Sequence, residues 1–317
     1  MKKHIAVAVI FAALVSACAG VRGVPIFTNE RLPSGGLAIS VAVADKDARA
    51  EGERAGVGQF ASRLKSELET ALSQGGFVVL PADAPKVEAT LKVTMSGALG
   101  AAGTPEKVRA VLTGKEASTT ATSAPWPYYK DALFGDEEQV RGELARAVAL
   151  ELANQLIEAK ETRVMVAGAE ERRIVALAAR YHEPVRAPSE KTGRPLAYIP
   201  FDANEQGAEF AGALQTLLLY DLLENKCARV REVSLSKDKA ALCKSDECLR
   251  VAARLSKGEE LLTGSYRGEG IERTLHLKVL GESDVRYEQE LSLPVGEVSH
   301  RLKGAAKALG AVLSCSE

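Results

Sequence analysis

The two halves of this 317-residue chain show the same order of predicted elements. Each half reads as a strand, a helix, a second strand, three antiparallel strands and a closing helix, and the second half has an extra helix before its antiparallel strands. Few letters match between the halves, so the repeat rests on the type and spacing of the elements. We therefore expect an α+β (α/β) fold, a tandem repeat of a small β-α-β-(α)-β-β-β-α unit with a mixed sheet.

In the first half, the spacing of apolar residues changes from helical to alternating. Apolar side chains recur at intervals of three and four between residues 56 and 74, and Gly75 and Gly76 end this predicted helix. Between Ala89 and Met95 they alternate with threonine and lysine, as in a sheet with one face in water. The other expected elements are strands over 37–44, 77–80, 108–113 and 117–123 and a helix over 137–160.

The second half repeats this series after a connector that is harder to interpret. Residues 163–168 resemble a strand, and 170–181 fit either a helix or a strand. Beyond the connector we expect strands over 196–201, 229–233, 259–267, 273–280 and 285–293 and helices over 208–223, 247–255 and 295–313. The predicted organisation is a signal peptide (1–17), a tether (18–36), a first domain (37–160), a connector (161–195) and a second domain (196–317).

The first residues carry the parts of a secretory signal. An apolar run from Ile5 to Val15 follows two lysines and precedes small residues, and it is too short for a stable membrane span. The sequence Val15-Ser16-Ala17-Cys18 resembles the lipobox of bacterial lipoproteins, in which the signal is cut before a cysteine that then carries fatty acids such as palmitate. We expect Cys18 to be the lipidated first residue. The alternative is an ordinary cleaved signal with a cysteine nearby by chance.

The same resemblance bears on location. In such lipoproteins an aspartate directly after the cysteine favours retention at the inner membrane, and Ala19 stands at that position here. The resemblance implies a lipid anchor in the outer membrane, with the chain facing the periplasm. Glycines, prolines and a weak apolar pattern in 18–36 predict a flexible tether with a mean reach of about 20–25 Å.

Composition excludes one class of partner. The sequence is 46% hydrophobic and 26% charged, as in a globular protein, and no stretch after the signal is long and apolar enough for a membrane helix. Without residues 1–17 the chain has a small acidic excess. Because nucleic-acid binding normally requires a basic excess, we expect no nucleic acid among the partners.

Four cysteines remain once Cys18 is assigned to lipid, and all lie in the second half. An oxidising periplasm favours disulfides, and three pairings are possible. We favour Cys243 with Cys248, which are close in sequence, and Cys227 with Cys315. A zinc site is the less favoured alternative because no histidine stands at metal-ligand spacing.

The sequence contains no recognisable catalytic motif. His182, His276 and His300 are far apart, and neither a Gly-x-Ser-x-Gly elbow nor a phosphate-binding Gly-x-x-x-x-Gly-Lys loop occurs. We therefore expect no enzyme activity, no cofactor and no metal.

One aromatic cluster stands out in a chain with a single tryptophan. It comprises Trp126, Tyr128, Tyr129 and Phe134, with prolines on both sides of the tryptophan. One interpretation is a partner-binding patch, because tryptophan and tyrosine dominate binding hot spots. The favoured interpretation is a loop clamped over the sheet edge, which needs no partner.

Two short motifs carry a family resemblance. Tyr198-Ile199-Pro200-Phe201 before a helix and the segment 260–266 (ELLTGSY) in the antiparallel strands are similar to the small α/β domain of the TolB amino-terminal, CsgG and LpoB type. The resemblance covers residues 196–313 and, more weakly, 37–160.

This resemblance implies a non-enzymatic, periplasm-facing outer-membrane lipoprotein. It would be an accessory or scaffold subunit of a cell-envelope assembly for secretion, cell-wall synthesis, transport or motility, with envelope proteins as partners and an oligomer possible. The alternative is a ligand-binding receptor or hydrolase with a cleft between the domains.

Overall fold

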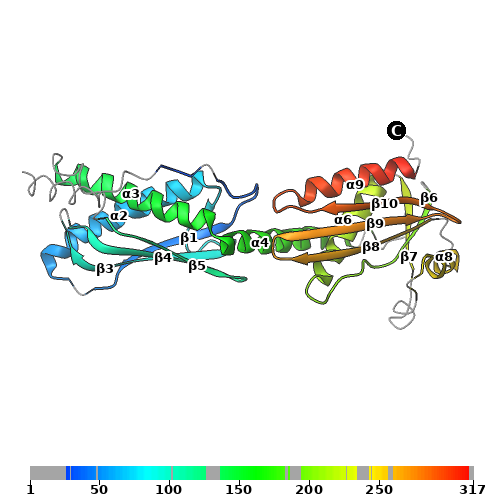
Figure 1. Ribbon diagram of the computed structural model, residues 1–317, viewed down its shortest axis with the longest axis horizontal. Coiled ribbons are helices and arrows are strands. Elements are labelled where there is room, and N and C mark those ends of the chain that lie inside the picture. The colour runs from blue at the N-terminus through cyan, green and yellow to red at the C-terminus, as the bar shows by residue number, and fades with distance from the viewer. Residues whose placement is uncertain are drawn as a thin grey trace, which may run out of the picture. The chain divides into compact units, whose positions relative to one another are not determined.

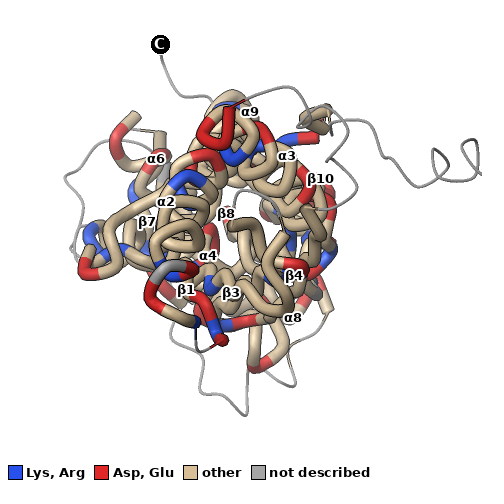
Figure 2. The backbone as a smooth tube through the Cα atoms, turned by 90° about the vertical axis from the view of Figure 1, so that its left-hand side faces the viewer, with Lys and Arg blue, Asp and Glu red and all other residues tan. Residues whose placement is uncertain are grey.

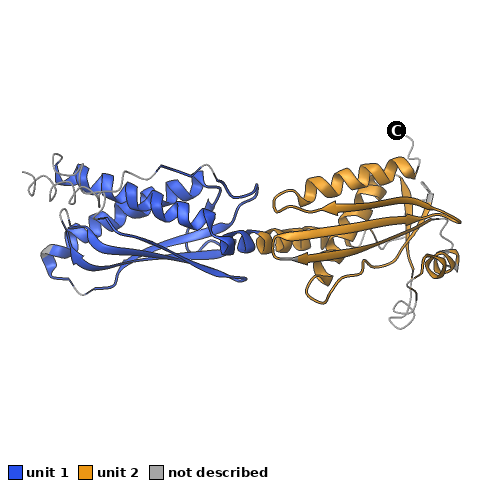
Figure 3. Cartoon of the chain, in the orientation of Figure 1, with its two compact units in different colours: residues 1–166 blue, residues 167–317 orange. Residues whose placement is uncertain are grey.

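The computed structural model describes residues 26–28, 30–47, 49–100, 103–125, 136–182, 185, 194–225, 227–233, 243, 245–255 and 260–313. It divides into two compact units, residues 1–166 and 167–317 (Figure 3). The boundary falls inside the segment that the sequence predicts to be a connector.

Unit 1 is a five-stranded mixed sheet with helices on one face (Figure 1). The strand order is β2-β1-β3-β4-β5, in which β1 runs parallel to β2 and β3 and the last three strands are antiparallel. Its strands are β1 (Ala38–Asp45), β2 (Val78–Val79), β3 (Ala89–Leu99), β4 (Pro105–Gly114) and β5 (Ser118–Ser123), and its helices are α2 (Glu51–Gln74) and α3 (Glu137–Glu158).

The core of unit 1 follows from the apolar pattern of the sequence. Leu91, Val93 and Met95 alternate with polar residues along β3 and are fully buried. Helices α2 and α3 pack against this face with stripes of buried side chains that include Leu64 and Leu152. Because each such side chain stabilises the fold by about 1.5–3 kcal/mol, this face of the sheet is fixed inward.

Unit 2 repeats this architecture with one addition. Its strand order is β7-β6-β8-β9-β10, with β6 parallel to β7 and β8, so the second sheet has the same topology as the first. The strands are β6 (Arg194–Tyr198), β7 (Ala228–Glu232), β8 (Glu260–Glu269), β9 (Glu272–Leu280) and β10 (Val285–Ser292), and the helices are α6 (Ala208–Glu224), α8 (Asp246–Leu255) and α9 (Val298–Val312). The α+β tandem repeat predicted from the sequence is confirmed.

The two faces of the second sheet are covered differently. Helices α6 and α9 build the main core with the inner face of the sheet. The extra helix α8 packs on the opposite face, where Leu249 and Ala252 join Leu261 and Leu280 in a small separate cluster. Unit 2 therefore has a helix on each side of its sheet.

The connector corrects one prediction. Residues 163–168, predicted to be a strand, lie inside helix α4 (Lys160–Ala178), which buries Met165, Val166, Ala169 and Ile174. The predicted strand is wrong because the apolar run continues at helical spacing through Ile174.

Candidate functional site

A segment before the first strand is fastened to unit 1. The side-chain amide of Asn154 on α3 donates to the Ile26 carbonyl (2.8 Å) and accepts from the Thr28 amide (3.0 Å). Leu32 is buried, and its amide donates to the carbonyl of Gly75 (2.9 Å). We call residues 26–36 the strap.

Two further features hold the strap in place. Glu30 forms an ion pair with Arg163, which adds about 0–1 kcal/mol because both side chains are about half exposed. Gly36 has a left-handed φ of 47°, and a Cβ built there would lie 2.1 Å from the Gly76 carbonyl oxygen, so only glycine fits. Of the predicted tether 18–36, residues 18–25 remain before the strap.

The sheet of unit 1 leaves one face uncovered by α2 and α3. We define the open face by the strand positions whose side chains point away from these helices, most of them exposed: Val78, Ser40, Ala42, Ala44, Thr90, Lys92, Thr94, Lys107, Arg109, Val111, Thr113, Ser118, Thr120 and Thr122. Small and hydroxyl side chains dominate it. Lys92, Lys107 and Arg109 are the charged members, and no carboxylate occurs among these positions.

The corresponding face of unit 2 has a different character. Its cations are paired with acids, as in the contacts of Lys278 Nζ with Asp246 (2.8 Å) and of His276 Nε2 with Glu288 (3.1 Å). Helix α8 covers part of it. Figure 2 shows basic and acidic positions interspersed along the chain as a whole, so the lack of acids on the open face is a local property.

A side chain of α3 bonds to the backbone of β5, the outer edge strand of unit 1's sheet. Gln155 on α3 accepts a hydrogen bond from the Thr122 amide (3.0 Å) and donates one to the Thr122 carbonyl (2.9 Å). Both backbone groups of Thr122 therefore point away from β4. Since successive residues of a strand point to opposite sides, the backbone groups of Thr120 and Ser118 also face outward.

An arginine locks the loop after β1. Arg49 donates to Asp45 (2.9 Å), Asp47 (3.1 Å) and the Gly97 carbonyl (2.8 Å), and the hydrogen bond to Asp45 raises the pKa of Arg49 above its ordinary value. Because these contacts engage the guanidinium, we assign Arg49 a structural role.

Unit 2 contains a buried charge cluster. The Arg273 side chain is fully buried, and its Nη2 lies 2.6 Å from Glu170. Its Nη1 lies 3.7 Å from Glu171, its Nε donates to the Leu293 carbonyl (3.2 Å), and the guanidinium stacks over Phe210. Sequence reasoning missed this arginine, although it occupies a core-facing position of an alternating strand.

A hollow of about 690 Å³ lies beside this cluster at the β8–β9 hairpin. Asn204, Tyr266, Arg267, Thr274 and Ser292 are among its lining residues. Burial, reinforced by the nearby Glu171, raises the pKa of Tyr266 to about 12. The phenol therefore stays protonated near neutral pH and is poorly suited to act as a general base.

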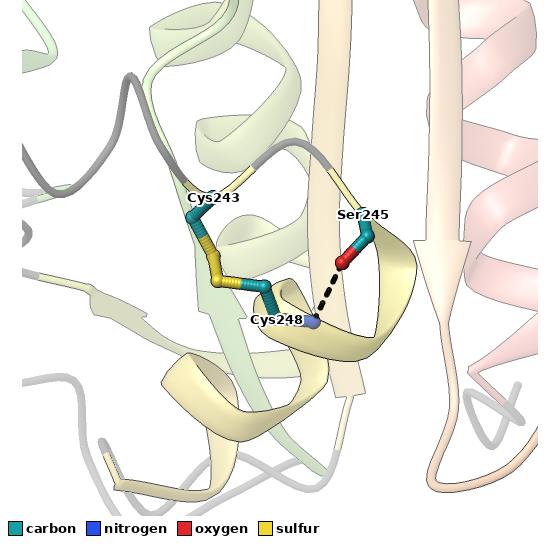
Figure 4. The surroundings of a disulfide bond; sticks show 3 residues. All are labelled: Cys243, Ser245 and Cys248. Atoms are coloured by element: carbon teal, nitrogen blue, oxygen red, sulfur yellow. Dashed lines mark hydrogen bonds between the residues drawn. A yellow bond between two sulfur atoms is a disulfide. The ribbon is translucent and has the colours of Figure 1, made fainter.

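A disulfide joins Cys243 to Cys248 at the start of α8 (Figure 4). The Cys248 amide also donates a hydrogen bond to the Ser245 hydroxyl oxygen (3.3 Å), which caps the first turn. This pair belongs to the pairing that the sequence favours among the three possible ones. Cys227 is buried, and its predicted partner Cys315 lies outside the described residues.

The other predicted site residues fall mostly outside the described part of the chain. This applies to Cys18 and to Trp126, Tyr128, Tyr129 and Phe134. Over the described residues, no group of three or more potential metal-ligating side chains comes together. Of the helices that the structure describes, none has both the length and the apolar character needed to cross a membrane.

Two solved structures are similar to part of the chain. TolB from Acinetobacter baumannii matches 40% of this chain and 30% of its own length, with 14% identity and a TM-score of 0.30. The C-terminal domain of LpoB from Salmonella enterica matches 38% of this chain and 95% of its own length, with 12% identity and a TM-score of 0.23. No family model and no curated protein matches the sequence.

Proposed function

We propose that this protein is a non-enzymatic lipoprotein that is anchored through Cys18 in the outer membrane and faces the periplasm. There it acts as an accessory or scaffold subunit of a cell-envelope assembly. The proposal combines the signal and lipobox pattern of residues 1–18 with two α+β units.

The strap is the observation that supports this proposal most strongly. Its hydrogen bonds to unit 1 begin at Ile26, so only seven residues, 19–25, separate the strap from the lipidation site, Cys18. Fully extended, such a segment spans about 28 Å. An anchor at Cys18 would therefore keep the start of unit 1 close to the membrane surface, and the partners reached by unit 1 would lie there too.

The described side chains favour a scaffold over an enzyme. The buried ionisable groups hold the fold together, as Arg273 does with Glu170 and Leu293. The open face of unit 1, by contrast, is a broad exposed surface of small and hydroxyl side chains. A surface of this kind suits docking of another protein.

Fractionation of cells that express the full chain tests the anchor. The native chain should be found in the outer-membrane fraction and should incorporate a fatty-acid probe. Cys18→Ser should lose the label and be released from the membrane. Cys243→Ser serves as the matched control, because it also removes a cysteine but should stay on the membrane. Unchanged membrane retention of Cys18→Ser would contradict the proposal.

A further inference from the structure

We propose that the outer edge of β5 binds an extended segment of a partner protein, which adds to unit 1 as a sixth strand with acidic side chains on the open face. This inference deepens the proposed scaffold function and rests on it for the idea that a partner protein exists. Its structural basis is the backbone of β5.

Outward-facing backbone N–H and C=O groups of β5 can pair with an added strand. The contacts of Gln155 show that both polar groups of Thr122 face outward, and the two-residue period of a strand extends this to Thr120 and Ser118. In the described part of the chain, Gln155 is the side chain that bonds to this edge. An incoming strand could pair with Thr120 and Ser118 first and then displace the Gln155 amide at Thr122.

The sequence of β5 lacks the usual protection of an exposed edge. Natural edge strands carry charges, prolines or bulges that block further pairing, whereas β5 reads STTATS and pairs with β4 in unbroken register. The topologically equivalent edge strand of unit 2, β10, carries Arg286, Glu288 and Glu290 and a break in register. The same position in the fold is thus protected in one unit and unprotected in the other.

The charge of the open face determines which segment fits. An added strand would lie about 4.8 Å from β5 and about 9.6 Å from β4, where Arg109 is exposed opposite Thr122. Carboxylates on the same face of the added strand would meet Arg109 and, beyond it, Lys107, whose Nζ also lies 3.9 Å from Glu106. On the other face, Glu151 of α3 lies at the edge, in contact with Ser123, so uncharged side chains fit there.

A second copy of the chain is a poorer occupant. Pairing β5 with β5 of another copy would bring two cationic open faces into one continuous sheet, with no carboxylate among the open-face positions to balance Lys92 and Arg109. The acidic segment is therefore the favoured occupant.

The test uses the mature chain with Cys18→Ser, so it does not depend on the lipid. The probe is a fluorescein-labelled octapeptide in which glutamate alternates with valine, and binding is followed by fluorescence anisotropy. We expect saturable binding with a dissociation constant below 1 mM. A peptide with lysine in place of glutamate should bind at least ten-fold more weakly.

Two variants should shift this binding in opposite directions. Thr120→Pro removes an outward N–H that the β4–β5 ladder does not use, so it should abolish binding with little change in melting temperature. Gln155→Ala exposes the backbone of Thr122 and should strengthen binding several-fold. Gln139→Ala is the matched control on the same helix, because the Gln139 side chain donates to Glu143 of α3 and not to β5.

Four results would overturn the proposal. The first is that the glutamate peptide does not bind saturably to the Gln155→Ala variant, and the second is that it binds equally to Thr120→Pro and to the native sequence. The third is equal binding of the glutamate and lysine peptides. The last is that no peptide binds and the protein forms a dimer that Thr120→Pro dissociates. The last would assign the edge to a second copy. Because the lipid is absent, each result bears on the β5 edge and leaves the anchor at Cys18 to the fractionation experiment.

Discussion

The buried cluster around Arg273 gives a prediction that can be worked out from distances. Glu170 accepts from Arg273 Nη2 (2.6 Å) with one carboxylate oxygen and from the Gly296 amide (2.9 Å) with the other. The variant Glu170→Gln keeps the shape but replaces one acceptor by an NH₂ group that faces another donor. It also removes the closest counter-charge of a fully buried guanidinium.

The lost acceptor and the lost counter-charge together set the expected decrease in the free energy of unfolding. Breaking a buried ion pair typically destabilises a protein by about 3–5 kcal/mol. Because Glu171 remains 3.7 Å from Nη1, we expect the lower end of this range, about 3 kcal/mol. At about 1.4 kcal/mol per factor of ten, this corresponds to an increase of about 150-fold in the opening equilibrium of unit 2.

Native-state hydrogen exchange read by mass spectrometry separates the two units. Glu170→Gln should raise the exchange of the most protected amides in β9 and α6, while those of β3 and β4 in unit 1 should not change. Glu171→Gln is the matched control and should cost less than 1 kcal/mol, because Glu171 is partly exposed and more distant from Arg273. A loss below 1 kcal/mol for Glu170→Gln, or an equal loss in both units, would refute the reasoning.

Three further predictions concern unit 2. Burial raises the pKa of Glu171, so the folded state retains its proton at pH values where the unfolded chain has lost it. This contribution to stability is present below about pH 4.5 and is lost as pH rises through the folded pKa. Urea midpoints measured between pH 4 and 7 should therefore fall more steeply with pH for the native chain than for Glu171→Gln. A steeper fall for Glu171→Gln would contradict this. Tyr266 should titrate with a pKa of about 12, so Tyr266→Phe should reduce the tyrosinate absorbance that develops above pH 11 in an ultraviolet titration; an unchanged signal there would rule this out. The double variant Cys243→Ser/Cys248→Ser opens a short loop, so its free energy of unfolding should be about 2 kcal/mol lower than that of the native chain, measured by urea unfolding. An equal free energy of unfolding would show that the disulfide adds no stability.

The repeated architecture could be predicted because each element has a clear apolar period. The alternation in β3 and the three-and-four spacing in α2 bury the residues that the pattern indicates, and the extra helix of the second half is α8. The failure at 163–168 has a physical cause, since a short run of valine, methionine and alanine fits a strand or a buried helix equally well. Only the residues after it, up to Ile174, reveal the helical spacing.

The features of the candidate site were harder to predict because they depend on contacts between distant residues. Asn154 binds backbone 126 and 128 positions away in sequence, and Gln155 binds Thr122 on another element. In a sequence, a glutamine or asparagine within a predicted helix gives no sign that its side chain binds the backbone of a distant segment. Arg273 did carry a signal, a charge in the buried phase of an alternating strand, but its partner Glu170 lies 103 residues away.

A lipid anchor at Cys18, joined to unit 1 by a short tether, is tested most directly at the mature N-terminus. Protein extracted from outer membranes and digested with trypsin should yield a first peptide that begins at Cys18 and ends at Arg22. Mass spectrometry should show this peptide carrying a diacylglyceryl group on the cysteine. A first peptide without lipid, or one that begins at another residue, would contradict the account.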